Sequence, residues 1–143
     1  MQGKGSAITA ASAGQVREQI LVVLQAWGMA PDLAAVTAGL MAETDLLGID
    51  SHGISMLPAY EEKWHAGSLK LDARPRLVRD GGASALLDGM GGLGYPVSAQ
   101  AMNLAVDKAL EHGVGAVSVC NSHHFGAAGV YARIAVELSL IHI

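Results

Sequence analysis

A β-strand, a glycine-rich turn and the beginning of a helix are predicted by the ten residues Ala85-Leu86-Leu87-Asp88-Gly89-Met90-Gly91-Gly92-Leu93-Gly94. The first four suit a short strand, and the glycines permit a tight turn. A long helix is expected from about Pro96 to His112, and the apolar, β-branched run Val114 to Val119 predicts the next strand. A last helix is expected at about 126–137. This part of the chain therefore predicts a β-α-β-α segment.

Upstream of this segment the sequence predicts helices. Apolar residues recur on one helical face from Val16 to Trp27, with Ser12 as the N-cap. A second helix is expected from Pro31 to about Leu47, because proline is tolerated in a first turn. A third should begin after His52-Gly53 and end before Gly67.

A short strand is also expected at Arg76 to Arg79, joined to the strand at 85–88 by the turn residues 80–82. The fold class is therefore mixed α+β. We expect a helical N-terminal unit at residues 1–70 and an incomplete α/β domain at 71–143, with a boundary near Leu69 to Arg74.

Composition excludes several classes of protein. Of 143 residues, 51% are hydrophobic and 15% are charged, and the net charge is −4. The chain is too apolar for intrinsic disorder, and its balanced charge argues against a nucleic-acid or anionic membrane partner. Its single cysteine cannot form an internal disulfide, which favours the cytoplasm. The apolar end at residues 138–143 indicates that the natural protein continues or that these residues are not native.

The glycine cluster Gly89 to Gly94 contains the spacing G-x-G-x-x-G between a predicted strand and a predicted helix. That context is typical of a dinucleotide-binding turn, in which backbone N–H groups approach a pyrophosphate. The next strand, however, ends in Cys120-Asn121 and lacks the acidic residue that would hold the ribose. A tight turn without a phosphate is the alternative.

A histidine between two predicted helices, in Asp50-Ser51-His52-Gly53, is a candidate for proton transfer. The unperturbed pKa of histidine, about 6.5, suits proton exchange near neutrality. Asp50 or another acid could fix its tautomer. Alternatively, Asp50 or Ser51 caps the following helix and His52 has no role.

A second candidate site, Asn121-Ser122-His123-His124-Phe125-Gly126, directly follows a predicted strand. Functional sites in open α/β sheets gather at the carboxyl ends of strands. Adjacent residues of an extended segment point to opposite faces, so His123 and His124 should not bind one metal ion together. We expect no metal site, although a metal-dependent lyase using Cys120 and His124 is an alternative.

Taken together, these motifs resemble the type-2 malate/L-lactate dehydrogenase family, which includes ureidoglycolate dehydrogenase, diketogulonate reductase and sulfolactate dehydrogenase. The resemblance rests on Gly48-Ile49-Asp50-Ser51-His52-Gly53, Leu57-Pro58-x-Tyr60, Asp88-Gly89 with Gly94, and residues 121–129 in the same order and spacing. It covers residues 15–137, roughly the first two-fifths of such an enzyme.

The resemblance implies hydride transfer between NAD or NADP and C2 of a 2-hydroxy or 2-oxo acid. It further implies a non-Rossmann fold, in which residues 89–94 form a tight loop beside the site. His52 and His124 match catalytic histidines of the family, and His52 is slightly favoured as the acid. Ser51 and Tyr60 match polar substrate-site positions of the family, and Asn121 is a further substrate-binding candidate from its place after the strand.

The family's cofactor domain lies mainly beyond residue 143, with Gly126 as a weak cofactor-binding candidate in this chain. The 143 residues alone are therefore expected to be inactive. The full-length enzyme is expected to be a homodimer, because the apolar excess suits surfaces that are covered in an assembly.

One position departs from the family pattern. Many members have arginine four residues after the histidine of the Ser-His-Gly motif, where this chain has Met56. A missing guanidinium makes malate or lactate less expected as substrate, unless another group binds the carboxylate. Alternatively, Met56 only packs in the core. From a different functional class, a non-catalytic helical binding or assembly module would also fit the apolar composition.

Overall fold

The computed structural model describes residues 10–138 and 140 and shows a mixed α+β fold. In chain order its elements are α1 (Ala13–Ala26), α2 (Pro31–Leu46), the 3₁₀ helix η1 (Ile54–Met56), α3 (Leu57–His65), β1 (Arg76–Gly81), β2 (Ser84–Asp88), α4 (Gly94–His112), β3 (Ala116–Cys120) and α5 (Ala128–Val136). The predicted fold class and order of elements are confirmed. The prediction about residues 138–143 falls mostly outside the described residues.

Local sequence signals explain where the first helices begin. The Ser12 hydroxyl accepts a hydrogen bond from the Gln15 N–H at 3.3 Å, and the Gln15 side chain accepts one from the Ser12 N–H at 2.9 Å. This reciprocal pair is a capping box, which satisfies two otherwise unpaired donors. Pro31 occupies the first turn of α2, as predicted.

The sheet has the order β1-β2-β3, with β1 antiparallel and β3 parallel to the central strand. The last residue of β2, Asp88, lies opposite the last residue of β3, Cys120. The loops after these two strands therefore leave the sheet at the same edge.

The apolar run predicts that strand β3 begins at Val114, but the strand begins two residues later, at Ala116. The reason is the close passage of the chain against α4: a Cβ on Gly115 would lie 1.9 Å from the Ala105 carbonyl oxygen. Gly113 ends α4 with a φ of 79°, so residues 113–115 turn the chain and pairing with β2 starts only afterwards.

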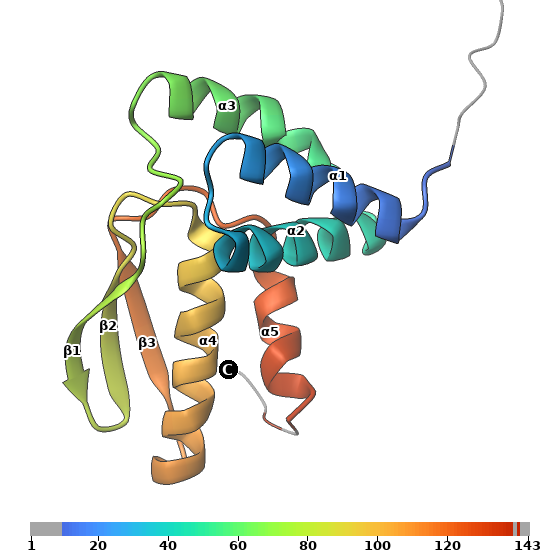
Figure 1. The fold of residues 1–143 in the computed structure, drawn as a ribbon. Coiled ribbons are helices and arrows are strands. Elements are labelled where there is room, and N and C mark those ends of the chain that lie inside the picture. Colours follow the sequence, from blue (N-terminus) through green and yellow to red (C-terminus); the bar gives the residue numbers. More distant parts are fainter. Residues whose placement is uncertain (1–9, 139, 141–143) are drawn as a thin grey trace, which may run out of the picture.

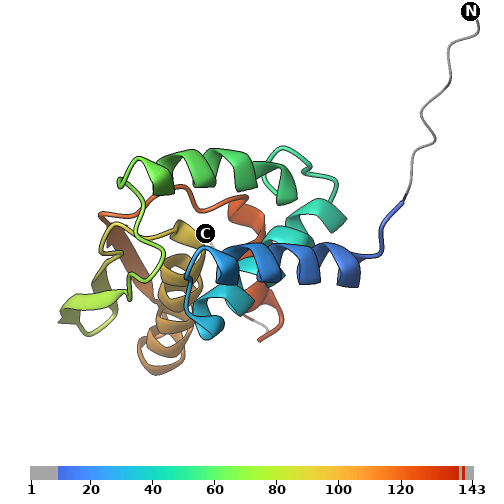
Figure 2. The ribbon, with the colours of Figure 1, turned by 45° about the horizontal axis from the view of Figure 1, so that its top comes forward.

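Helix α4 lies between the sheet and α5, whereas α1, α2 and α3 lie across the end of α4 at which β2 and β3 finish (Figure 1). Figure 2 brings this end of the molecule toward the viewer. The positions of the elements therefore bring the helical part of the chain next to the carboxyl ends of the parallel strands.

The larger hydrophobic core lies at that junction. It joins buried residues of α1, α2 and α3 to Leu93, Tyr95, Val130 and Tyr131 from the second half of the chain. A smaller cluster, Leu87, Val97 and Ala101, fixes α4 on the sheet. The two halves expected from the sequence thus share one core. Among the described residues, no helix is both long enough and apolar enough to cross a membrane.

Candidate active site

The two predicted catalytic histidines come together although they are far apart in the sequence. His52 lies in the turn between α2 and η1, and His124 lies in the loop between β3 and α5. Their ring centroids are 5.3 Å apart with planes inclined by 38°, and both side chains are half-buried. Two imidazoles at this separation can act on one small molecule.

The turn that carries His52 is held by Asp45, near the end of α2. The Asp45 carboxylate accepts a hydrogen bond from the Ile54 N–H at 2.9 Å and so caps η1. A Cβ on Gly53 would lie 1.7 Å from the same carboxylate, so only glycine fits there. The alternative that Asp50 or Ser51 caps this helix is therefore wrong: the capping carboxylate belongs to Asp45, which no local motif indicated.

Ser51 contacts His52 directly. The Ser51 hydroxyl oxygen lies 2.8 Å from Nδ1 of His52, on an exposed part of the turn. The carbonyl of Asp50 accepts a hydrogen bond from the Ser55 hydroxyl. A hydroxyl, rather than the Asp50 carboxylate suggested by the sequence, is thus the neighbour that orients the His52 ring. Met56 is partly buried and packs against the larger core.

The loop that carries His124 is fixed by its neighbours on both sides. Asn121 has a φ of 50°, and its side-chain amide donates to the Asp88 carboxylate at 2.9 Å. Nε2 of His123 lies 2.8 Å from the Ser68 carbonyl oxygen, whereas Nδ1 of His124 lies 2.7 Å from the Tyr60 hydroxyl. The adjacent histidines therefore have different partners. Asn121 is engaged at the end of the sheet, and its substrate role stays a prediction.

The backbone N–H groups of the glycine cluster donate hydrogen bonds to carbonyls of the protein itself. The N–H groups of Gly89, Gly91 and Gly94 donate to the carbonyls of Cys120, Asn121 and His124 at 2.8–3.0 Å.

Because those donors are already used, they cannot hold a pyrophosphate as a dinucleotide-binding turn does. A Cβ on Gly94 would also lie 2.4 Å from the Phe125 Cβ. The glycines serve close packing against the His124 loop.

Two buried tyrosines connect the histidine segments. The Tyr60 hydroxyl lies 2.7 Å from Nδ1 of His124 and 3.1 Å from the Tyr95 hydroxyl. The Tyr95 hydroxyl in turn donates to the His52 backbone carbonyl at 3.1 Å. Tyr60 is predicted from the sequence to bind substrate, and that role stays a prediction, whereas Tyr95 was not predicted. The available signal was a polar aromatic residue at the end of the glycine cluster, in a chain that has three tyrosines.

Burial sets the protonation of these groups. It lowers the pKa of His124 below the ordinary 6.5, and the neighbouring His52 lowers it further. Burial likewise raises the pKa of Tyr60 and of Tyr95 above the ordinary 10. At neutral pH, His124 is therefore uncharged and both tyrosines keep their hydroxyl protons.

The remaining predicted residues have structural contacts. The Cys120 thiol lies 3.6 Å from the Leu87 carbonyl oxygen. Gly126 has a φ of 75° and packs against the Tyr95 ring, where a Cβ would lie 2.5 Å from a ring carbon. Within residues 10–138, no three histidine, cysteine or acidic side chains are arranged to hold a metal ion, so the lyase alternative gains no support.

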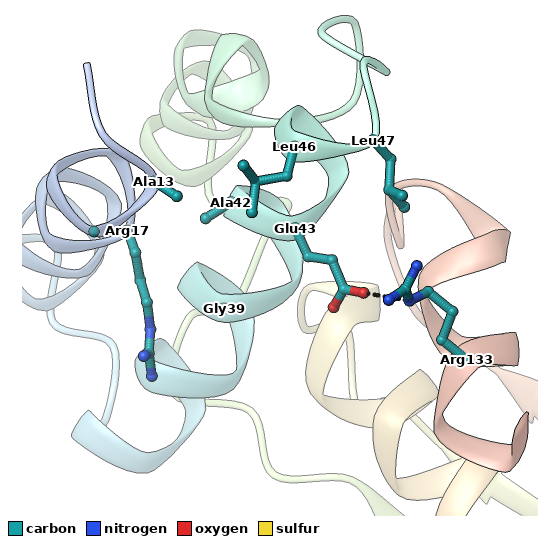
Figure 3. A pocket seen from close by; sticks show the side chains of 9 residues that line it. Ala13, Arg17, Gly39, Ala42, Glu43, Leu46, Leu47 and Arg133 are labelled. Carbon is teal, nitrogen blue, oxygen red and sulfur yellow. Dashed lines mark ion pairs between the residues drawn. The ribbon is translucent and has the colours of Figure 1, made fainter. Parts of the chain in front are cut away.

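A separate hollow of about 500 Å³ lies between α1, α2 and α5 (Figure 3). Arg17 and the ion pair of Glu43 with Arg133, at 2.8 Å, line it. None of the predicted site residues lines this hollow.

Comparisons with known proteins identify relatives over nearly the whole chain. A sequence profile of the family described as malate/L-lactate dehydrogenase matches residues 11–143. A malate dehydrogenase from Pyrococcus abyssi is 40% identical over 87% of this chain and 34% of its own length. An L-sulfolactate dehydrogenase from Methanocaldococcus jannaschii is 36% identical over 89% of this chain and 37% of its own.

Solved structures agree. Malate dehydrogenase from Pyrococcus horikoshii superimposes with a TM-score of 0.87 at 34% identity, over 96% of this chain and 40% of that structure. The chain thus spans between a third and two-fifths of the length of these relatives. With the family's sequence pattern and its fold both present, the chain belongs to the malate/L-lactate dehydrogenase family.

Proposed function

We propose that this chain is the N-terminal part of an oxidoreductase that moves a hydride between NAD or NADP and C2 of a 2-hydroxy or 2-oxo acid. The observation that carries the proposal is the pair of half-buried histidines, whose ring centroids are 5.3 Å apart, with Nδ1 of His124 against the buried Tyr60 hydroxyl. Hydride transfer at an alcohol carbon requires a group that takes or gives the hydroxyl proton. The family and its named dehydrogenases supply the reaction class.

In the oxidation direction, the C2 hydroxyl proton passes to one imidazole as the C2–H bond breaks. The oxidised nicotinamide, when bound, supplies the hydride acceptor, and the products are the 2-oxo acid, the reduced cofactor and a protonated histidine. The second histidine stabilises the negative charge that develops on the substrate oxygen. In reduction the same steps run backwards.

The cofactor's phosphates are proposed to bind elsewhere than at residues 89–94, because the N–H groups of all four glycines there donate to the protein's own carbonyls. Gly126 borders the site through its N–H, 3.4 Å from Nδ1 of His124, and stays a weak candidate for cofactor contact. We propose that most cofactor-binding residues lie in the part of the protein absent from this chain.

Ser51 and Asn121 are proposed to contact the substrate. Met56 places a thioether where many relatives have arginine, so the substrate carboxylate is bound by another group or the substrate is bulkier than malate.

A homo-oligomer in the cytoplasm is also part of the proposal. Leu46, Leu110 and Val136 are each more than half exposed. Such side chains could be covered in an assembly. The division into units at residue 70 also remains a proposal, although the larger core extends across that position.

The full-length protein is expected to oxidise NADH or NADPH in the presence of at least one member of a panel of 2-oxo acids, followed by absorbance. Cofactor binding to the native state must also raise thermal stability. If no member of the panel is turned over and neither cofactor raises the unfolding temperature, the proposal is contradicted and a non-catalytic module is favoured.

For oxidation of the 2-hydroxy acid, kcat/KM is expected to fall on the acidic side only below pH 6.5, which is the ordinary pKa of histidine. His124 is the proposed base, so oxidation needs its neutral imidazole, whose pKa is lowered by burial and by the neighbouring His52. Activity should therefore be retained as pH falls to 6.5 and lost only below it. A limb centred above 6.5 would contradict this assignment.

A further inference from the structure

Counting protons shows which group is the donor in each hydrogen bond of the series that links His124 to the backbone of His52. It contains three bonds in series, from His124 Nδ1 to Tyr60 at 2.7 Å, from Tyr60 to Tyr95 at 3.1 Å, and from Tyr95 to the His52 carbonyl at 3.1 Å. A carbonyl oxygen only accepts, and a neutral tyrosine hydroxyl donates one proton.

The last bond fixes the direction of the others. The Tyr95 hydroxyl donates its only proton to the His52 carbonyl, so Tyr60 must be the donor in the hydrogen bond between the two tyrosines. Tyr60 then accepts from Nδ1 of His124, which must carry a proton. The Gly126 N–H also approaches this nitrogen, but at 3.4 Å it is too long to compete with the bond at 2.7 Å.

We propose that Tyr95 is a positioning residue which, acting through Tyr60, holds neutral His124 with its proton on Nδ1 and leaves Nε2 as the atom that accepts the substrate's hydroxyl proton. This inference rests on the proposed function for its last step, whereas the tautomer rests on the hydrogen bonds alone. The two tyrosines are almost completely buried, at 1% and 0% exposure, so water does not replace the bonds.

The arrangement has a chemical consequence. When Nε2 takes the proton, the imidazolium keeps its Nδ1–H bond to Tyr60, and none of the three bonds has to reverse. With the other tautomer, Nε2 would already carry its proton and could not act as the base. Holding one tautomer is a known function of a residue behind a catalytic histidine, and its loss can cost up to about 10⁴-fold in turnover.

The experiment is nitrogen NMR of the histidine rings in the full-length protein labelled with ¹⁵N-histidine, at about pH 8, where the ring is neutral. The His124 signals are assigned by their loss in His124→Gln. In the wild type, Nδ1 is expected to be the protonated nitrogen and Nε2 the unprotonated one. Tyr95→Phe frees the proton of Tyr60 for Nδ1 and is expected to shift the ring toward protonation at Nε2. It should also lower kcat for oxidation roughly 10- to 100-fold with a smaller change in KM.

Tyr131→Phe is the matched control. Tyr131 is also buried, and its hydroxyl donates to the Phe125 carbonyl rather than to the tyrosine pair. This variant should lose a buried hydrogen bond without moving the His124 tautomer.

An unprotonated Nδ1 in the wild type overturns the inference, and so does an unchanged tautomer in folded Tyr95→Phe. If that variant does not fold, the wild-type spectrum decides alone. If the tautomers behave as expected but no 2-oxo acid is reduced, the proposed function fails while the hydrogen-bond assignment stands.

Discussion

Replacing His124 by glutamine in the full-length protein is expected to lower kcat for 2-hydroxy acid oxidation by about 10²- to 10⁴-fold, the range of a lost acid–base group. His52→Gln should lose most of the turnover as well, because the proposed mechanism uses both rings, whose centroids are 5.3 Å apart. The double variant should be little worse than the poorer single variant, because groups that act together are not additive.

The measurement is initial-rate kinetics with the best substrate of the 2-oxo acid panel and the corresponding 2-hydroxy acid. His65→Gln is a suitable control, since His65 lies on α3 with an exposed side chain whose nearest acidic partner, Glu61, is 3.9 Å away. Wild-type turnover in both His52→Gln and His124→Gln would remove the histidines from the mechanism.

The elements that sequence could predict are those determined by neighbours along the chain. The N-cap at Ser12 and the proline start of α2 depend on local rules, and both are confirmed. Strand β3 was placed two residues early, because its start depends on how closely Gly115 passes Ala105, a contact across two elements.

The candidate site was predictable in part for the same reason. The motifs around His52 and His124 suggested a shared site through the family resemblance, and the structure brings the two rings together. Asp45 and Tyr95 were not found, because their roles depend on contacts with Ile54 and with the His52 carbonyl that no local spacing encodes. Pattern alone also could not show that the glycine cluster uses its N–H groups on the loop after β3.

Gly94→Ala is expected to destabilise the full-length protein by about 3 kcal/mol, the upper part of the range for overpacking a buried site. The added Cβ would lie 2.4 Å from the Phe125 Cβ and 2.7 Å from the His123 carbonyl oxygen. These atoms belong to backbone and to a Cβ, so a side-chain rotation cannot relieve the overlap. The loop must move, and the bond from the Gly94 N–H to the His124 carbonyl, now 3.0 Å, must lengthen.

Urea unfolding of Gly94→Ala beside Gly39→Ala separates crowding from the general effect of replacing glycine. Gly39 lies inside α2 with no atom within 4 Å of an added Cβ, so alanine there should stabilise by about 0.5–1 kcal/mol. Close packing at the third glycine is also needed in a dinucleotide-binding turn, so stability alone does not separate the two functions and cofactor affinity must be measured as well. Weakened cofactor affinity in the folded Gly94→Ala variant would return the glycine cluster to cofactor binding, whereas a loss of stability with unchanged cofactor affinity would support packing of the loop that carries His124 as the function of Gly94.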